Sequence, residues 1–389
     1  MINKKLSLVT LFLFFLISTY LSYTTFAKGG SLILPKTNYK APQANQNSQV
    51  TNDSIASEEK TEECPLNGEL FGKTVAQKWA KKRPLGIMVE NSTAARPQSG
   101  LSSADIVYEA VAEGGITRFL NIYYCQDASY VGPVRSARIY FVKLLQEYGD
   151  NPLYAHVGGA NTDGPADALG EIDDLGWGLY NDLNQFGVPF PYYWRDYERL
   201  PGRITEHTVY TTTTKLWEFA KSKRNLTNTD KKGKAWDVNF EKWKFKDDTN
   251  SAERGKLTKI SFSFWDSFAK DYSVVWTYEK AINSFKRSNG GSPHIDKNTD
   301  KQLESKNVVV VFAKESPAND GYPGGHILYK LTGSGDGLVF LDGNAIEITW
   351  NKKTEDSRMK FFDTNGREVS FVRGQIWIEI LPVGNEVTY

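Results

Sequence analysis

The chain has 389 residues, of which 40% are hydrophobic and 13% aromatic, enough to bury the cores of two domains. Its 47 basic and 46 acidic residues leave a formal net charge of +1. This balance excludes the broad basic surface of proteins that bind nucleic acids without sequence preference, so we expect no nucleic-acid partner. This balance of charges still allows a local basic pocket.

Residues 1–27 have the pattern of an export segment. Lys4 and Lys5 precede an uncharged, apolar run from Leu6 to Phe26, and small residues flank a cleavage point after residue 27. The run is also long enough to span a bilayer, so it is either a cleaved signal peptide or a membrane anchor. Both alternatives place the remaining chain at the outer face of the cytoplasmic membrane or outside the cell. Residues 28–63 are polar and Pro-containing, which predicts a flexible linker.

Cys64 and Cys125 are the only cysteines. In an exported chain they can form a disulfide or remain two unrelated thiols, and both alternatives stay open. No cysteine precedes Cys64, so the chain lacks an N-terminal lipid acceptor. The four histidines are scattered without the spacing of metal ligands, and we expect neither a metal nor a cofactor.

Residues 64–225 alternate between strand and helix patterns, which predicts an α/β domain. The expected strands are 85–90, 104–111, 117–124 and 153–157, and the expected helices are 138–148, 166–175 and 212–221. Gly114 and Gly115 predict a hairpin turn between two of the strands, and Gly149 predicts the end of a helix.

The following segment, 235–389, is predicted to be a strand-dominated domain. Charged residues 222–256 indicate a linker and an exposed strand around Trp236–Phe245. Alternating apolar residues then predict further strands at 257–264, 274–278, 308–313, 326–331, 338–341, 346–350 and 375–381. Two glycine-containing stretches, Gly333–Gly337 and Asp342–Asn344, are interpreted as turns.

The most distinctive polar residues of the first domain are arginines beside turn residues. They are Arg96, Arg118, Arg135 and Arg138, interleaved with Glu109 and Glu113. Because the guanidinium group is a planar fork of donors that stays charged, it suits carboxylates and phosphates, so these residues predict an anion-binding pocket. Arg135 and Arg138 stand three apart at an expected helix start and can point to one side. The alternative is an ion-pair network, in which Arg118 pairs with Glu109 or Glu113.

Two histidines and a further arginine are candidates for the same pocket. His156 ends a predicted strand before two glycines, where it could contact a ligand or simply pack a loop. His207 follows Glu206 in a stretch that also contains Arg195. Arg195 ends an aromatic run, which could stack on a sugar ring or form the edge of a core.

The first domain resembles the YerB-like family of exported bacterial proteins of unknown function. The motifs that carry the resemblance are 90–91 with 95–101, 104–109, 113–119 and 132–138, together with His156, Gly158–Gly159 and Arg195–Asp196. Residues 287–296, 307–310 and 374–378 match more loosely. The resemblance covers about residues 65–385 and implies a two-domain envelope protein without an established activity. This chain departs from the family in lacking the lipid-acceptor cysteine, and in having Glu206-His207-Thr208 where the family has Pro-His-Asn, which leaves the role of His207 open.

These observations favour an accessory or binding protein of the cell envelope. Its Arg-rich pocket would hold an anionic or glycan ligand, its partner would be a wall polymer or an envelope protein, and its N-terminal segment would reach the membrane. One alternative is an enzyme acting on a wall polymer or a lipid-linked phosphate, because the strand bearing Asp105 and the nearby arginines are similar in layout to LytR-type phosphotransferases. Another is a structural module that binds proteins. The absence of a catalytic motif favours a role without catalysis.

Overall fold

The computed structural model describes residues 16–20 and 58–389. Residues 16–20 are helical, and the rest of the predicted export segment and most of the predicted linker lie outside the described residues. No helix within the described residues is long and apolar enough to cross a membrane. Residues 58–389 belong to one compact unit.

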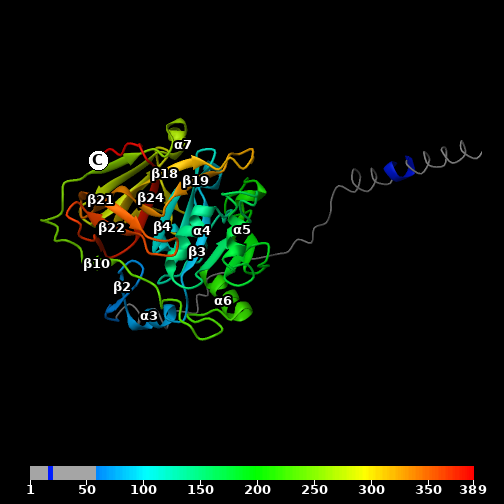
Figure 1. Cartoon of the computed structure of the whole chain (residues 1–389), viewed down its shortest axis with the longest axis horizontal. Coiled ribbons are helices and arrows are strands. Elements are labelled where there is room, and N and C mark those ends of the chain that lie inside the picture. Colours follow the sequence, from blue (N-terminus) through cyan, green and yellow to red (C-terminus); the bar gives the residue numbers. More distant parts are fainter. Residues whose placement is uncertain (1–15, 21–57) are drawn as a thin grey trace, which may run out of the picture. The chain divides into compact units, whose positions relative to one another are not determined.

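An 11-stranded mixed sheet runs through this unit (Figure 1). From one edge to the other its strands are β22 (Lys360–Asp363), β21 (Asn344–Lys352), β20 (Gly333–Leu341), β18 (Asn307–Pro317), β24 (Ile376–Pro382), β4 (Ile106–Glu113), β5 (Ile116–Tyr123), β3 (Leu85–Glu90), β6 (Leu153–His156) and β7 (Asp182–Asn184). The eleventh strand, β19 (Ile327–Lys330), pairs with the far half of β18.

The last strand of the chain occupies the middle of this sheet. β24 is parallel to β18 on one side and to β4 on the other, with Ile378 paired to Val309 and to Tyr108. Six of its seven residues, 376–381, are buried and all of these except Glu379 are apolar, as is usual for a strand covered on both faces. Strands from the two predicted segments therefore share one continuous sheet.

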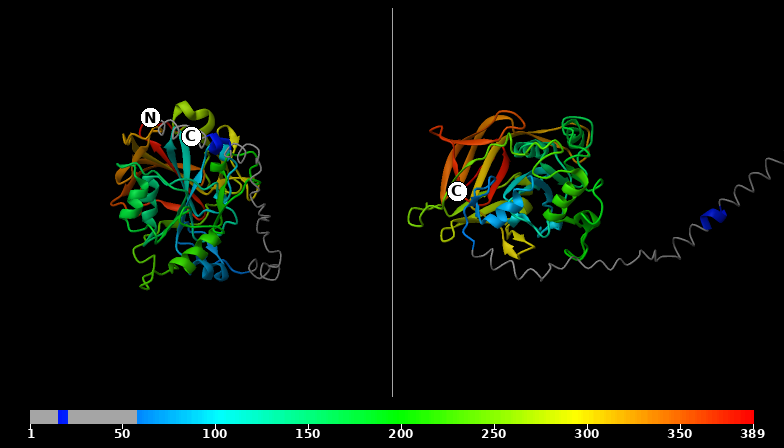
Figure 2. Two further views of the ribbon diagram at one scale, coloured as in Figure 1. Left: turned by 90° about the vertical axis from the view of Figure 1, so that its right-hand side faces the viewer. Right: turned by 90° about the horizontal axis from the view of Figure 1, so that it is seen from below.

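The helices lie mainly beside the N-terminal strands. They are α3 (Lys73–Trp79), α4 (Ile139–Leu145), α5 (Ala168–Asp174), α6 (Thr213–Arg224) and the short α7 (Ala269–Tyr272). The Thr212 hydroxyl accepts the backbone N–H of Lys215 at 3.0 Å, an N-cap that fixes the start of α6. In the right panel of Figure 2 the green helices and the orange and red strands lie at opposite ends of the unit.

A second, five-stranded sheet packs on one face of the main sheet. It contains β11 (Lys259–Phe262), β12 (Val274–Glu279), β13 (Ser284–Asn289), β14 (Ser292–Pro293) and β17 (Glu304–Ser305). Trp276 of β12 meets Trp377 of β24 edge to face, with ring centroids 5.2 Å apart. On the opposite face, the Tyr140 hydroxyl of α4 donates to the carbonyl of Val111 at 2.6 Å.

Short elements complete the fold. The paired strands are β1 (Glu62–Glu63) with β2 (Leu70–Phe71), β8 (Tyr193–Arg195) with β9 (Val209–Thr211), β10 (Lys244–Lys246) with β23 (Ser370–Val372), and β15 (Ile295–Asp296) with β16 (Lys301–Gln302). The 3₁₀ turns are η3 (Thr93–Ala95), η4 (Leu101–Ser103), η5 (Gln146–Tyr148), η6 (Thr205–His207) and η7 (Asp266–Phe268).

Most elements expected from the sequence are present, and two expectations are wrong. The predicted exposed strand at Trp236–Phe245 contains strand only at its end, where β10 (Lys244–Lys246) begins. Trp236 is buried rather than exposed, and its ring packs 5.0 Å from that of Tyr124. The predicted turn at Gly333–Gly337 is the beginning of β20. There Gly335 permits close packing, since a Cβ atom would lie 2.7 Å from the indole nitrogen of Trp350.

The two cysteines form a disulfide, which settles the alternatives left open by the sequence. Cys64 and Cys125 are both buried, and Asp105 lies beside them. The Asp105 carboxyl group accepts the backbone N–H groups of Tyr124 and Cys125 at 2.6 and 3.0 Å. Burial raises the pKa of Asp105 to about 7, although these two hydrogen bonds oppose the rise.

Candidate functional site

Arg118 and Arg138 converge on Glu113. Arg118 lies on β5 and its Nη2 is 3.1 Å from Glu113 Oε1, while Arg138, which precedes α4, donates its Nε to Oε2 at 2.8 Å. Both arginine side chains are more than nine-tenths buried. Burial alone would raise the pKa of Glu113, but the two guanidinium groups outweigh it and hold that pKa at about 2. These two arginines thus share one carboxylate, which is one of the partners considered for Arg118.

Arg135 binds a different pair of carboxylates. Its Nη2 is 3.0 Å from Glu206, and its Nε is 3.5 Å from Glu90 at the end of β3. The ring of His207 contacts the same two acids, with Nδ1 2.8 Å from Glu90. Arg135 and Arg138 are three residues apart but bind different acids. Arg135 and His207 form one continuous cluster with Glu90 and Glu206, and this cluster reaches solvent at Glu206.

Four arginines near this cluster have no carboxylate partner in the described part of the chain. We name Arg96, Arg195, Arg199 and Arg203 the arginine face. Arg195 donates to the carbonyl of Thr205 at 2.5 Å, directly before Glu206.

The other members of the arginine face also donate to neutral acceptors. Arg203 donates to the carbonyl of Arg96 at 3.4 Å. Arg199 donates to the Ser99 hydroxyl at 2.7 Å and to the Asn298 amide oxygen at 2.6 Å. Arg195 and Arg203 are exposed, whereas Arg96 and Arg199 are half-buried. The face therefore presents guanidinium groups held by neutral acceptors.

His156 forms no hydrogen bond with a residue of the arginine face among its described contacts. It is fully buried at the end of β6, where Nε2 is 2.7 Å from Asp182 of β7 and Nδ1 is 2.7 Å from the carbonyl of Gly158. Both ring nitrogens are occupied by oxygen partners within the chain. His156 thus joins the edge strand β7 and the glycine loop to the sheet.

Glu109 points away from Arg118, Arg138 and Glu113 and into the contact between the two sheets. It forms an ion pair with Arg287 of β13, and both side chains have no exposed surface. Glu379 of β24 lies 3.8 Å from the same guanidinium group and accepts the indole N–H of Trp276 at 3.0 Å. Burial, reinforced by the charge of Glu109, raises the pKa of Glu379 well above its usual range. One arginine thus faces two buried acids.

A chain of hydrogen bonds connects this buried pair to the surface cluster. Arg287 lies 2.6 Å from Nδ1 of His294, and Nε2 of His294 lies 2.8 Å from the Gln98 amide oxygen. The Gln98 amide in turn donates to the carbonyl of Glu90 at 3.0 Å. Burial, with the charges of Arg287 and Arg96, lowers the pKa of His294 well below its usual value, so the ring is neutral.

No sequence pattern connects Arg287, His294 and Glu379 with Glu109. Arg287 comes from β13, His294 lies between β14 and β15, and Glu379 comes from β24. Only the packing of the two sheets brings them to β4. Arg199 and Arg203, by contrast, were near His207 in the sequence, and their arginine-rich stretch was a usable signal.

Comparison with known proteins places the chain in a family. A model described as "Protein of unknown function (DUF3048) N-terminal domain" matches residues 70–227, and the corresponding C-terminal domain model matches residues 265–378. "Putative lipoprotein YerB" of Bacillus subtilis (strain 168) is 31% identical over 325 residues, which are 82% of this chain and 86% of the relative. The crystal structure of the YerB protein from Bacillus subtilis matches with a TM-score of 0.67 and 28% identity, over 85% of this chain and 100% of that chain. The resemblance to YerB-like proteins is thereby confirmed, and the chain belongs to the DUF3048 family.

Proposed function

We propose that this protein is an exported envelope protein that binds an anionic glycan on the arginine face. This face would belong to an N-terminal segment of the α/β class. The observation that carries the proposal is the exposure of Arg195 and Arg203 without a carboxylate partner in the described chain. The printed name of the Bacillus subtilis relative supports an envelope location. The export pattern of residues 1–27 agrees with that location.

The arrangement of charges favours the arginine face over the buried arginines as the binding surface. Arg118 and Arg138 are buried and both bind Glu113, so an anion that displaced Glu113 there would have to break a buried ion pair, which costs about 3–5 kcal/mol. The guanidinium groups of Arg195 and Arg203 donate only to backbone carbonyls and a hydroxyl. Their remaining N–H groups can bind a carboxylate or a phosphate without such a loss.

Apolar side chains beside the arginines favour a glycan over a small inorganic anion. Tyr197 is 52% exposed and Ile204 is 61% exposed, and both belong to the loop that carries Arg199 and Arg203. A sugar ring can pack its apolar face on an exposed aromatic ring while its charged substituent meets an arginine. The ligand class is therefore a glycan that carries acidic groups.

The test uses the full-length chain in detergent and isothermal titration calorimetry with an oligosaccharide of galacturonic acid. We expect binding that an uncharged oligosaccharide of equal length does not show. The double substitution Arg195→Gln with Arg203→Gln should weaken binding by at least about tenfold, since two charge-assisted hydrogen-bonding groups are lost.

The matched control for this test is Arg367→Gln. Arg367 is 76% exposed and pairs with Asp363 within β22 and its turn, so this variant should bind like the wild type. Equal binding by the double variant and the wild type, or equal binding of the charged and uncharged oligosaccharides, would overturn the proposal. Because Arg195 and Arg203 are exposed, the double variant should keep the wild-type melting temperature, which separates loss of binding from loss of fold.

A further inference from the structure

A polar hollow lies in the C-terminal segment, where β18 of the main sheet changes its pairing partner. β18 pairs with β20 as far as Val311 and Gly337, and beyond that point it pairs with β19 instead. Because β19 and β20 separate there, a cavity of about 740 Å³ opens between them. Its volume is in the range of small-molecule sites. The residues at its wall come from β18, β19, β20, β21 and the turn after β24.

Two lysines line one side of this hollow. Lys314 of β18 and Lys330 of β19 are directly paired in the antiparallel register, so both side chains project from the same face. Like charges in this position repel each other, and neither lysine has an ion-pair partner in the described chain. The neighbouring acid Glu315 does not neutralise them, because its carboxylate accepts hydrogen bonds from Trp265 and Tyr329.

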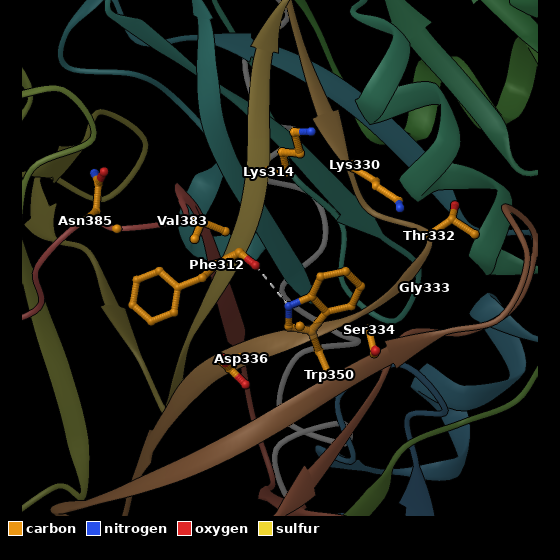
Figure 3. Close-up of a pocket in the computed structure, with 12 residues that line it drawn as sticks. Phe312, Lys314, Lys330, Thr332, Gly333, Ser334, Asp336, Trp350, Val383 and Asn385 are labelled. Atoms are coloured by element: carbon orange, nitrogen blue, oxygen red, sulfur yellow. Dashed lines mark hydrogen bonds between the residues drawn. The ribbon is translucent and has the colours of Figure 1, made fainter.

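The rest of the wall is suited to hydroxyl groups. In the view of Figure 3, Lys314 and Lys330 lie on one side of the Trp350 ring and Asp336 lies on the other. Asp336 is exposed and forms no ion pair within residues 58–389, and Ser334, also on β20, lines the same hollow. Trp350 is fixed as a rigid floor, since its indole N–H donates to the carbonyl of Phe312 at 3.1 Å. One side of the hollow is thus cationic and the other accepts hydrogen bonds.

We propose that this hollow binds a phosphorylated polyol or sugar. The two lysines would hold the phosphate, whose charge relieves their repulsion, and Asp336 would accept hydrogen bonds from the hydroxyl groups of the polyol. A phosphate group alone would use the lysines only, and an uncharged polyol would use Asp336 only. The site shares no residue with the arginine face and does not depend on it.

Ligand-observed NMR on the full-length chain in detergent tests the proposal with three probes: glycerol 3-phosphate, inorganic phosphate and glycerol. We expect glycerol 3-phosphate to bind more tightly than either of the other two. The double substitution Lys314→Gln with Lys330→Gln should weaken its binding by at least about tenfold. Asp336→Asn should weaken the binding of glycerol 3-phosphate and leave that of inorganic phosphate unchanged.

Lys301→Gln is the matched control, because Lys301 is an exposed strand lysine without an ion pair in the described chain. Binding by this variant should equal that of the wild type. The proposal is overturned if no probe binds, if the lysine double variant binds glycerol 3-phosphate like the wild type, or if inorganic phosphate binds as tightly as glycerol 3-phosphate. The lysine double variant should remain folded, since removing two opposed like charges raises the melting temperature of the unliganded protein.

Discussion

At the scale of single residues, the protein places several ionisable groups where their charge is costly. Asp105 and Glu379 are both fully buried, and burial raises the pKa of each. Glu113 behaves in the opposite way, because two arginines stabilise its charge. These acids were visible in the sequence, but the sign of each shift depends on neighbours that only the folded chain supplies.

Asp105 should make the stability of the fold depend on pH in a defined window. Its pKa is about 7 in the folded protein, against an ordinary value of 3.8, so the folded state holds the proton more tightly. The resulting stabilisation is complete below pH 3.8 and is lost as the pH rises through about 7. The variant Asp105→Asn lacks this dependence. We therefore expect its free energy of unfolding to rise relative to the wild type by about 1 kcal/mol per pH unit across the window.

Urea unfolding of both proteins at a series of pH values between 4 and 8 measures this difference. Glu113 is present in both proteins and cancels in the difference; its stabilisation begins to fall below the ordinary glutamate value of 4.5 and is lost as the pH falls through about 2. Glu379 acts in the same direction as Asp105, but it is present in both proteins and cancels in the difference. Parallel pH profiles for the two proteins would contradict the assignment.

At the scale of elements, the sequence predicted the positions of strands better than it predicted which strands and side chains lie beside them. The strand at 85–90 and the hairpin at Gly114–Gly115 are confirmed, since apolar runs and paired glycines with positive φ are local signals. Gly333–Gly337 was misread because glycine in a strand admits a neighbouring ring, here Trp350, which lies on β21. The ion pair of Arg118 with Glu113 lies within one hairpin and was among the predicted alternatives. The hollow beside Lys314 depends on where β18 changes partners, and no local pattern shows that.

The disulfide is an element-scale tether whose removal should be costly. It joins the turn between β1 and β2, which contains Cys64, to the residues directly after β5, across 61 residues. Closing a loop of this length is expected to stabilise the fold by about 4 kcal/mol through the unfolded state. We expect Cys64→Ala with Cys125→Ala to lower the free energy of unfolding by about that amount. Chemical denaturation with and without a reductant measures it, and the reductant should affect the wild type only. A wild-type protein that is insensitive to the reductant would show that the tether contributes nothing.

At the scale of the whole molecule, the central question is how strongly the two family-matched segments depend on each other. β24 from the C-terminal segment pairs over Ile376–Glu379 with β4 from the N-terminal segment. The buried pair of Arg287 and Glu109 also joins the two. A division into successive segments is what the sequence order suggests, because strand pairing between distant parts of a chain leaves no periodic signal in either part. The shared sheet makes each segment incomplete alone.

We therefore expect separate fragments comprising residues 58–231 and 232–389 not to fold individually. In the first fragment β4 would expose an unpaired edge, and Glu109 would lose Arg287, a loss that costs about 3–5 kcal/mol when one member of a buried pair is removed. In the second, β24 would lose β4 and Arg287 would be left beside Glu379 alone.

Near-ultraviolet circular dichroism of each fragment and of their equimolar mixture tests this expectation. The mixture should recover the signal of ordered aromatic rings, because Trp276 and Trp377 pack only when the second sheet covers the main sheet, and β4 completes that sheet. The control is the chain cleaved once between Lys231 and Lys232, an exposed position, which should keep the native signal. Cooperative unfolding of residues 58–231 alone would mean that the N-terminal segment supplies its own core. The contact between β4 and β24 would then be a docking surface between two independent domains, and the buried charges of Glu109 and Arg287 would have to be tolerated without each other.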